Sequence, residues 1–180
     1  PHCSSVCCMA SIKEAVIARE HDASIEPTVF YMDIRAYGKD FDKYYEKAKN
    51  EGGVRFVRSM ISRIVEDPLT KDLELTYVDE NNRLQTEIFD LVVLAVGIKP
   101  TESAIETSRL LGIKLDAENF CVTTTFDPVQ TSREGIFVAG AFQAPKDIPQ
   151  TVMEASSAAG AAMSLLVDQR NTLTSKKELP

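Results

Sequence analysis

The sequence lacks several patterns that mark particular protein classes. No apolar run approaches the roughly 20 residues that a membrane-spanning helix needs, since the longest, FDLVVLAVGI, has the length of a strand. The N-terminus has no basic stretch followed by an apolar one, so a secretory signal peptide is not predicted. With a net charge of −7 and no basic patch, the chain is not expected to bind nucleic acid. Its composition, 44% hydrophobic and 26% charged, indicates an ordinary soluble globular protein.

Two short motifs of redox proteins are also missing. No G-x-G-x-x-G occurs, although that glycine pattern binds the pyrophosphate of a dinucleotide at the start of a βαβ unit. No C-x-x-C occurs either, which disfavours a disulfide reductase that uses NAD(P)H and a cysteine pair.

Cysteines are few, yet three of the four fall within six residues, as Cys3, Cys7 and Cys8. Zinc prefers two pairs of ligands, and no second pair exists, since His2 and His21 lie at unsuitable spacing. A disulfide between neighbouring cysteines would be strained. A cubane iron–sulfur cluster takes four thiolates, of which this triplet could supply three. Two interpretations of the triplet therefore stay open. The three cysteines are ligands of such a cluster, or they are reduced thiols at the start of a helix.

The fourth cysteine, Cys121, stands alone in the apparent strand NFCVTTT, far along the chain from the triplet. We expect it to be a small buried hydrophobic residue, because free cysteine is among the most buried residue types.

The first half of the sequence predicts a βαβ unit. A helical pattern covers about residues 4–21, and the strand EPTVFYMDI follows. Next, Phe41, Tyr44, Tyr45 and Ala48 recur at helical spacing, until the pair Gly52-Gly53 ends the helix before the strand VRFVRS. A strand, a helix and a second strand in this order are typical of a parallel sheet.

The middle of the chain predicts antiparallel pairing. MISRIVED, LELTYVD and RLQTEIF alternate apolar and polar residues, with the turn DENN before the last of them. DLVVLAVGIKP then has the composition of a fully buried strand ending at Gly97.

The last part predicts helices around one more strand. ESAIETSRLLG should form a short helix capped by Gly112, and EGIFVAGAF a second buried strand. A helix rich in small residues follows over 148–170, in which alanines would allow close packing on a sheet: Ala155, Ala158, Ala159 and Ala162. The polar tail 171–180 is expected to be a linker.

The fold class is therefore α/β, with a parallel sheet, an antiparallel meander and a C-terminal helix. This is the layout of flavoproteins with two dinucleotide domains. Because the phosphate-binding glycines are missing, either the protein is of another kind or the chain begins partway through such a protein.

One candidate binding site lies in EGIFVAGAFQAPKDIP. A strand ending at Gly140 and a helix starting near Pro149 would place free backbone N–H groups at the end of a sheet, where anionic groups bind. Lys146 and Asp147 lie in the turn between them. An ordinary connection with a surface ion pair would give the same pattern. Arg35 and Tyr37 follow an earlier strand, at the position where proteins with a parallel sheet bind ligands, and a solvated loop would explain them equally well.

Four stretches together resemble a known family: CSSVCCMASIKEA, VFYMDIRAYGKDFDKYYEKAKNEGGVRFVR, FDLVVLAVGIKP and TSREGIFVAGAFQAPKDIPQTV. They are similar to the iron–sulfur flavoprotein subunit of heterodisulfide reductase and to related quinone-linked and sulfate-reducer flavoproteins. The resemblance covers nearly the whole chain.

The resemblance implies a thioredoxin-reductase-like core that binds FAD, cubane iron–sulfur clusters and flavin-based electron bifurcation. Residues 1–96 would be the second, inserted dinucleotide-like domain, and 97–170 the C-terminal return of the FAD domain. Cys3, Cys7 and Cys8 would be three ligands of one [4Fe–4S] cluster, with the fourth ligand before Pro1. The chain would be a fragment without the FAD phosphate loop and the downstream ferredoxin-like domain, and inactive alone.

The resemblance also implies FAD contacts. Ala141 takes the place of an aspartate that binds the ribityl hydroxyls in most two-domain flavoproteins. Lys146 would lie near the flavin ring and stabilise the anionic reduced flavin, while the N–H groups of Ile148 and the following turn would face its pyrimidine end. The full set of implied FAD residues is Gly97, Pro100, Gly140, Ala141, Phe142, Lys146, Asp147 and Ile148.

The implied activity is that of a cytoplasmic oxidoreductase whose acceptor is a disulfide or a related compound. Its partners would be other heterodisulfide-reductase-like subunits and an electron donor such as hydrogenase, ferredoxin or formate dehydrogenase, without direct insertion into a membrane. A homodimer is a further option. A non-catalytic docking or scaffold module without a cofactor is the alternative from another class, and the missing glycine loop motivates it.

Overall fold

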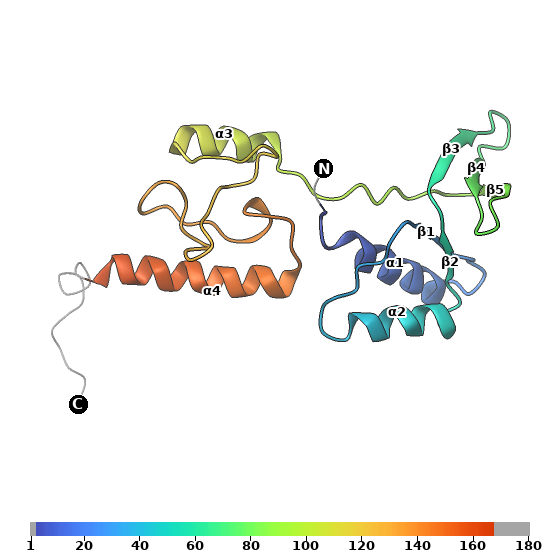
Figure 1. Cartoon of the computed structure of the whole chain (residues 1–180), viewed down its shortest axis with the longest axis horizontal. Helices are drawn as coiled ribbons and strands as arrows, with labels where there is room; N and C mark the ends of the chain where they lie inside the picture. Colours follow the sequence, from blue (N-terminus) through green and yellow to red (C-terminus); the bar gives the residue numbers. More distant parts are fainter. Residues whose placement is uncertain (1–2, 168–180) are drawn as a thin grey trace. The chain divides into compact units, whose positions relative to one another are not determined.

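A computed structural model describes residues 3–167 of the chain. The chain divides into two compact units (Figure 1). The first unit is Cys7–Val96, and the second combines the N-terminal segment up to Val6 with the chain from Gly97 onward. The assignment of these units to an inserted domain and an FAD domain stays a prediction.

The first unit begins with the predicted βαβ arrangement. Its elements are α1 (Cys7–His21), β1 (Thr28–Tyr31), α2 (Phe41–Asn50) and β2 (Arg55–Arg58). β1 and β2 pair in parallel, with Val29 opposite Phe56, which confirms the expected parallel sheet. α1 begins at Cys7, three residues later than expected.

The core of the first unit combines aliphatic and aromatic side chains. Ile12 of α1 is fully buried, and Ala48 of α2 is 3% exposed. The rings of Phe56 and Tyr45 meet edge to face with their centroids 5.0 Å apart, as do those of Phe30 and Tyr77. Such aromatic pairs pack α2 and the meander against the parallel strands.

The predicted meander is confirmed. β3 (Ile61–Glu66), β4 (Leu73–Val78) and β5 (Leu84–Phe89) form an antiparallel sheet in chain order. At the DENN turn, the carboxylate of Asp79 accepts hydrogen bonds from the N–H groups of Arg83 and Asn81, at 2.9 and 2.8 Å. These hydrogen bonds, that of Arg83 first, lower the pKa of Asp79.

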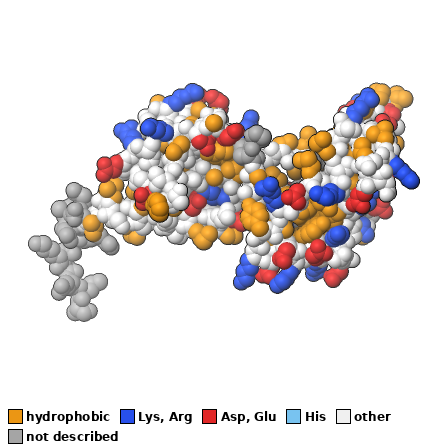
Figure 2. Space-filling model, viewed as in Figure 1, with side chains coloured by type: hydrophobic (Ala, Val, Ile, Leu, Met, Phe, Trp, Pro, Cys, Tyr) orange, Lys and Arg blue, Asp and Glu red, His pale blue; other side chains and the backbone are white. Residues whose placement is uncertain are grey.

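The stretch after β5 is not the buried strand that its composition predicts. Residues 91–96 form no strand, and their large apolar side chains are exposed: Leu91 76%, Val93 71%, Leu94 66% and Val96 86%. A buried strand needs neighbouring strands for its backbone groups, and no described residue pairs with this segment. Hydrophobic side chains are accordingly visible on the surface (Figure 2).

The second unit is built from helices and irregular segments. α3 (Glu102–Leu111) starts at Thr101, whose side chain accepts a hydrogen bond from the N–H of Ala104. It ends at Gly112, which has a left-handed φ of 66°, as expected for this helix cap. A short 3₁₀ turn, η1 (Gly140–Phe142), and the long helix α4 (Ile148–Leu165) follow.

Two expectations about the second unit are wrong. EGIFVAGAF forms no strand: Phe137 makes an isolated bridge with Gln130, and the glycine end of the segment is the 3₁₀ turn. The alanines of α4 do not pack on a sheet, since no described residue of this unit belongs to one and Ala155 and Ala159 are exposed. Both errors have one cause, because a strand and its covering helix depend on partner strands that these residues do not supply.

The helix expected over 148–170 is seen to Leu165, and its last predicted residues, together with the linker 171–180, lie outside the described residues. No helix between residues 3 and 167 combines the length and apolar character needed to cross a bilayer.

Candidate functional site

The Gly140 turn is a short bend fixed by backbone hydrogen bonds. Its first residue has a left-handed φ of 78°, a conformation that glycine adopts without strain. The N–H of Gln143 donates to the carbonyl of Gly140 at 3.0 Å, and the N–H of Cys121 donates to the carbonyl of Phe142 at 2.9 Å. The turn therefore joins the segment that contains Cys121 to the start of α4.

A buried polar network lies against this turn. The side chain of Lys146 is 5% exposed, and its Nζ donates to Oε1 of Gln143 at 2.6 Å and to Oε1 of Glu154. The other oxygen of Glu154, Oε2, accepts a hydrogen bond from the N–H of Gly140 at 2.8 Å. Gln143 is oriented in turn, because its Nε2 donates to Oγ1 of Thr123 at 3.0 Å.

The start of α4 has a side-chain cap. Asp147 precedes the helix, and its carboxylate accepts a hydrogen bond from the N–H of Gln150 at 2.9 Å. Pro149 lies in the first turn, as expected from the sequence. Ile148 is 80% exposed. Pro149 has no N–H, and the N–H groups of Gln150 and Thr151 both donate to Asp147, so the N–H of Ile148 is the first-turn donor that could face a ligand at this end.

A cavity of about 500 Å³ opens beside Lys146 and Glu154. Its walls combine these two charged side chains with the apolar Val129 and Met153. The complete lining is Ser5, Pro128, Val129, Ala144, Pro145, Lys146, Gln150, Met153, Glu154 and Ser157. A cavity with apolar walls and a few polar groups is the usual form of a site for a small molecule or cofactor.

The structure brings together six of the predicted site residues, from Gly140 to Ile148, but not all eight. Gly97 has a φ of 90°, and no described hydrogen bond joins it or Pro100 to the Gly140 turn. The neighbouring N–H of Ile98 donates instead to Oγ of the buried Ser4, at 2.7 Å.

Glu154 was not predicted from the sequence, although it is the partner of Lys146 and of Gly140. One signal could have found it. Between Ile148 and Leu165 it is the only charged residue, in a helix otherwise made of small, apolar and neutral polar residues. A lone carboxylate in such a helix requires a partner if it is not fully exposed to water.

The cysteines are all free thiols. Cys3 is exposed and accepts a hydrogen bond at its Sγ from the N–H of Ser5 at 3.4 Å. Cys7 and Cys8 are half-buried at the start of α1, and Sγ of Cys8 lies 3.8 Å from the carbonyl oxygen of Asp33. Thiols are the donors that an iron–sulfur cluster takes, but residues 3–167 contain no group of three or more side chains placed to hold a metal ion.

Cys121 is 3% exposed, which confirms the expectation of a buried residue. Burial raises the pKa of its thiol, because the charged form loses its hydration. The thiol is therefore less reactive than an exposed one.

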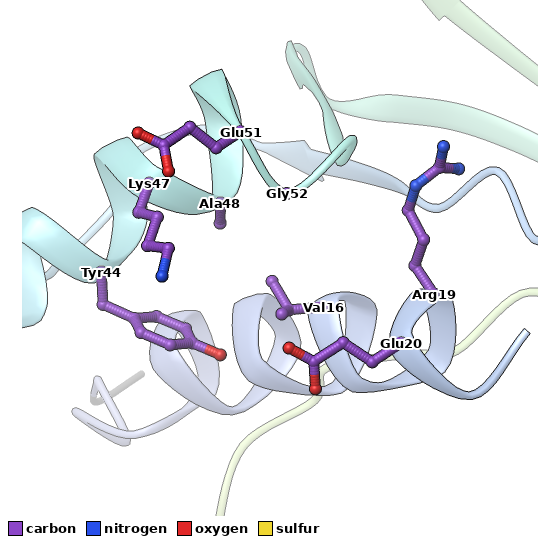
Figure 3. Close-up of a pocket in the computed structure, with 8 residues that line it drawn as sticks. All are labelled: Val16, Arg19, Glu20, Tyr44, Lys47, Ala48, Glu51 and Gly52. Carbon is purple, nitrogen blue, oxygen red and sulfur yellow. The ribbon is translucent and has the colours of Figure 1, made fainter. Parts of the chain in front are cut away.

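A second cavity, of about 390 Å³, lies between α1 and α2 in the first unit (Figure 3). Its lining carries charges of both signs, from Arg19 and Lys47 and from Glu20 and Glu51. The guanidinium of Arg19 donates to the carbonyl oxygen of Ile25 at 2.8 Å. The predicted candidates Arg35 and Tyr37 are not in this lining and are exposed, Tyr37 to 67%.

The chain matches known redox proteins over most of its length. Residues 12–159 match the family model described as pyridine nucleotide-disulphide oxidoreductase. Among solved structures, bacillithiol disulfide reductase from Bacillus cereus is similar, with a TM-score of 0.58, 19% identity and coverage of 89% of this chain and 48% of that one. This likeness supports the α/β fold.

Curated relatives are more similar in sequence. An iron-sulfur subunit of CoB–CoM heterodisulfide reductase from Methanopyrus kandleri is 41% identical over 170 residues, which are 92% of this chain and 26% of the relative. A subunit of the H2/formate:CoB-CoM heterodisulfide, ferredoxin reductase from Methanococcus maripaludis is 42% identical over 167 residues, 89% of this chain and 25% of the relative. The predicted resemblance is confirmed, and the chain spans about a quarter of the length of these relatives.

Proposed function

Because the chain belongs to the pyridine nucleotide-disulphide oxidoreductase family, we propose that it is part of the iron–sulfur flavoprotein subunit of a heterodisulfide reductase, which binds FAD and transfers electrons. The chain would then be a fragment of a longer, cytoplasmic protein and inactive alone. The observation that carries this proposal is the buried Lys146 at the wall of the cavity beside the start of α4.

The residues of the Gly140 turn fit a flavin in their chemistry. The ammonium of Lys146 has three N–H groups, and Gln143 and Glu154 accept only two of them. The third is left for an acceptor in the cavity. We assign the FAD contacts to Gly140, Ala141, Phe142, Lys146, Asp147 and Ile148, together with Gly97 and Pro100. When bound, FAD would supply the redox chemistry, while Lys146 would stabilise negative charge on the reduced ring.

We further propose that Cys3, Cys7 and Cys8 ligate one [4Fe–4S] cluster together with a fourth thiolate that precedes Pro1. The support is the donor chemistry of three free thiols and the name of the Methanopyrus relative, which calls it an iron-sulfur subunit. Electron bifurcation, the acceptor disulfide and partner subunits are part of the same proposal. The Methanococcus relative is named for H2 or formate, which supports hydrogenase or formate dehydrogenase as the donor. Its name places ferredoxin among the compounds that are reduced, so ferredoxin as a donor rests on the family resemblance alone.

The test uses the longest natural protein that contains this chain, purified without oxygen. We expect bound FAD, iron and acid-labile sulfide, and a Lys146→Met variant whose flavin potential differs from that of the wild type. Lys114→Met is the control, because Lys114 is an exposed lysine of the same unit. Absence of both cofactors would contradict the proposal, and an unchanged flavin potential would remove Lys146 from the mechanism.

A docking or scaffold module without a cofactor is the second candidate. The exposed apolar side chains of residues 91–96 favour it, because contiguous apolar surface is typical of contact sites between proteins. Anaerobic reconstitution separates the two candidates. The docking function is favoured if the protein takes up no cluster and if Cys3→Ser in the longest natural protein changes neither iron content nor electron transfer.

A further inference from the structure

One carboxylate joins Lys146 to the Gly140 turn. Glu154 accepts from the Lys146 ammonium with Oε1 and from the Gly140 N–H with Oε2. The side chain of Glu154 is 22% exposed and that of Lys146 is 5% exposed, so neither charge is well hydrated. Breaking such a pair by removing one partner leaves an uncompensated charge with little water, which is much more costly than losing a surface ion pair.

Among residues 3–167, Glu154 is the only acid that pairs with Lys146. The neighbouring Asp147 already accepts the hydrogen bond from the N–H of Gln150 that caps α4. Glu154 is also the only charged residue of that helix. The direction of the Lys146 side chain therefore depends on Glu154 and, through a neutral hydrogen bond, on Gln143.

We propose that Glu154 is a positioning residue, which holds the Lys146 ammonium against the Gly140 turn and leaves one N–H for a ligand in the adjoining cavity. Because the negative charge of Glu154 partly compensates that ammonium, Glu154 also limits how strongly Lys146 stabilises a reduced, anionic flavin. The effect on the flavin rests on the proposed function. The positioning of Lys146 does not, since it concerns only groups that are in contact within the chain.

Glu154→Gln separates charge from shape. The amide has nearly the same size, but it keeps one acceptor oxygen and replaces the other with an NH2 donor. In the observed geometry Lys146 and Gly140 donate to different oxygens, so the NH2 group would face one of them and that hydrogen bond is lost. The Lys146 ammonium also loses its compensating charge.

The first measurement is made without cofactor. Heteronuclear NMR of lysine ammonium groups in the cofactor-free chain should show a Lys146 signal protected from exchange with water, which Glu154→Gln abolishes. Glu106→Gln is the matched control, because Glu106 is an exposed glutamate on α3 of the same unit. If Glu154→Gln does not fold, Glu154→Asp replaces it, since its shorter side chain reaches one of the two partners and should weaken the signal. A Lys146 signal that neither variant changes overturns the positioning role.

The second measurement is the flavin potential in the longest natural protein. Glu154→Gln should shift it to a more positive value, because the positive charge near the reduced ring is less compensated. The same change in a Lys146→Met background should cause a smaller shift, because only the direct effect of removing the negative charge then remains. An unchanged potential, or an equal shift in that background, overturns action through Lys146. If the natural protein holds no FAD while the NMR result is as expected, the proposed function fails and the positioning role of Glu154 stands.

Discussion

The guanidinium of Arg55 on β2 binds the carboxylate of Glu87 on β5, and thereby ties the parallel strand pair to the meander. Nη1 of Arg55 donates to Oε1 of Glu87 at 3.1 Å, and Nη2 donates to Oε2. The hydroxyl of Tyr77 on β4 donates to the same carboxylate. The Arg55 hydrogen bond is the main cause that lowers the pKa of Glu87, against a smaller opposing effect of burial.

This ion pair predicts a pH-dependent stability. The pKa of Glu87 in the folded chain lies below the ordinary 4.5, so the unfolded chain binds the proton more readily. The stabilisation is therefore complete above pH 4.5 and is lost as the pH falls through the folded pKa. At neutral pH, Glu87→Gln should lower the free energy of unfolding by about 1 kcal/mol or less, because the pair is partly exposed to water.

Urea unfolding of the wild type and Glu87→Gln, from neutral pH to below 4.5, checks this prediction. The difference between them should shrink as the pH falls. Glu74→Gln is the control, since Glu74 on β4 is exposed and its side chain has no hydrogen-bonding partner among residues 3–167. A difference that is constant across the range would contradict a role for the Glu87 charge.

Two glycines of the second unit should respond to alanine in opposite directions. At Gly140, a Cβ would lie 3.0 Å from Cγ2 of Thr151, and the left-handed φ of 78° disfavours any L side chain. Gly140→Ala should therefore lower the free energy of unfolding by about 1–2 kcal/mol. Gly160, within α4, has nothing within 4 Å of such a Cβ, so Gly160→Ala should raise it by up to about 1 kcal/mol.

Thermal or urea unfolding of the two variants measures both effects in the same background. Equal effects of the same sign would show that the Gly140 turn is not strained by a side chain. Gly140→Ala should also disturb the hydrogen bond from the Gly140 N–H to Glu154. Gly160→Ala should leave it intact.

The exposed apolar segment 91–96 predicts self-association. Such a run, which pairs with no strand among residues 3–167, can pair with another copy at sufficient concentration. Val93→Lys should reduce the average mass found by sedimentation velocity, because a charge opposes edge pairing. Leu69→Lys is the control: Leu69 is 91% exposed but lies outside this run. If both variants reduce association equally, the general charge of the chain is responsible rather than the segment.

The first unit could be predicted well because its information is local. The helical spacing of Phe41, Tyr44 and Tyr45, the glycine pair after α2 and the alternation of the meander each specify an element within a few residues. Even so, the sequence does not show that Arg55 and Glu87 meet, since residues 32 positions apart are joined only by the packing of two sheets.

The second unit was predicted less well for the opposite reason. EGIFVAGAF in this unit and DLVVLAVGI at the end of the first unit both have strand composition, but a strand needs a neighbour along its length. Phe137 has only an isolated bridge with Gln130, and residues 91–96 pair with no described strand. Lys146 was identified from the sequence as a candidate, whereas its partner Glu154 was not, because a helix is needed to return a carboxylate to the turn before it.

By itself the sequence determined the α/β class, the family resemblance, the cysteine triplet and the lysine of the turn, since each depends on residue type and spacing along the chain. The tertiary structure alone decided which charges pair and which apolar segments are covered. The pairing of Lys146 with Glu154 and the exposure of residues 91–96 both depend on which groups folding brings within contact distance, and contact in space has no fixed relation to separation in sequence.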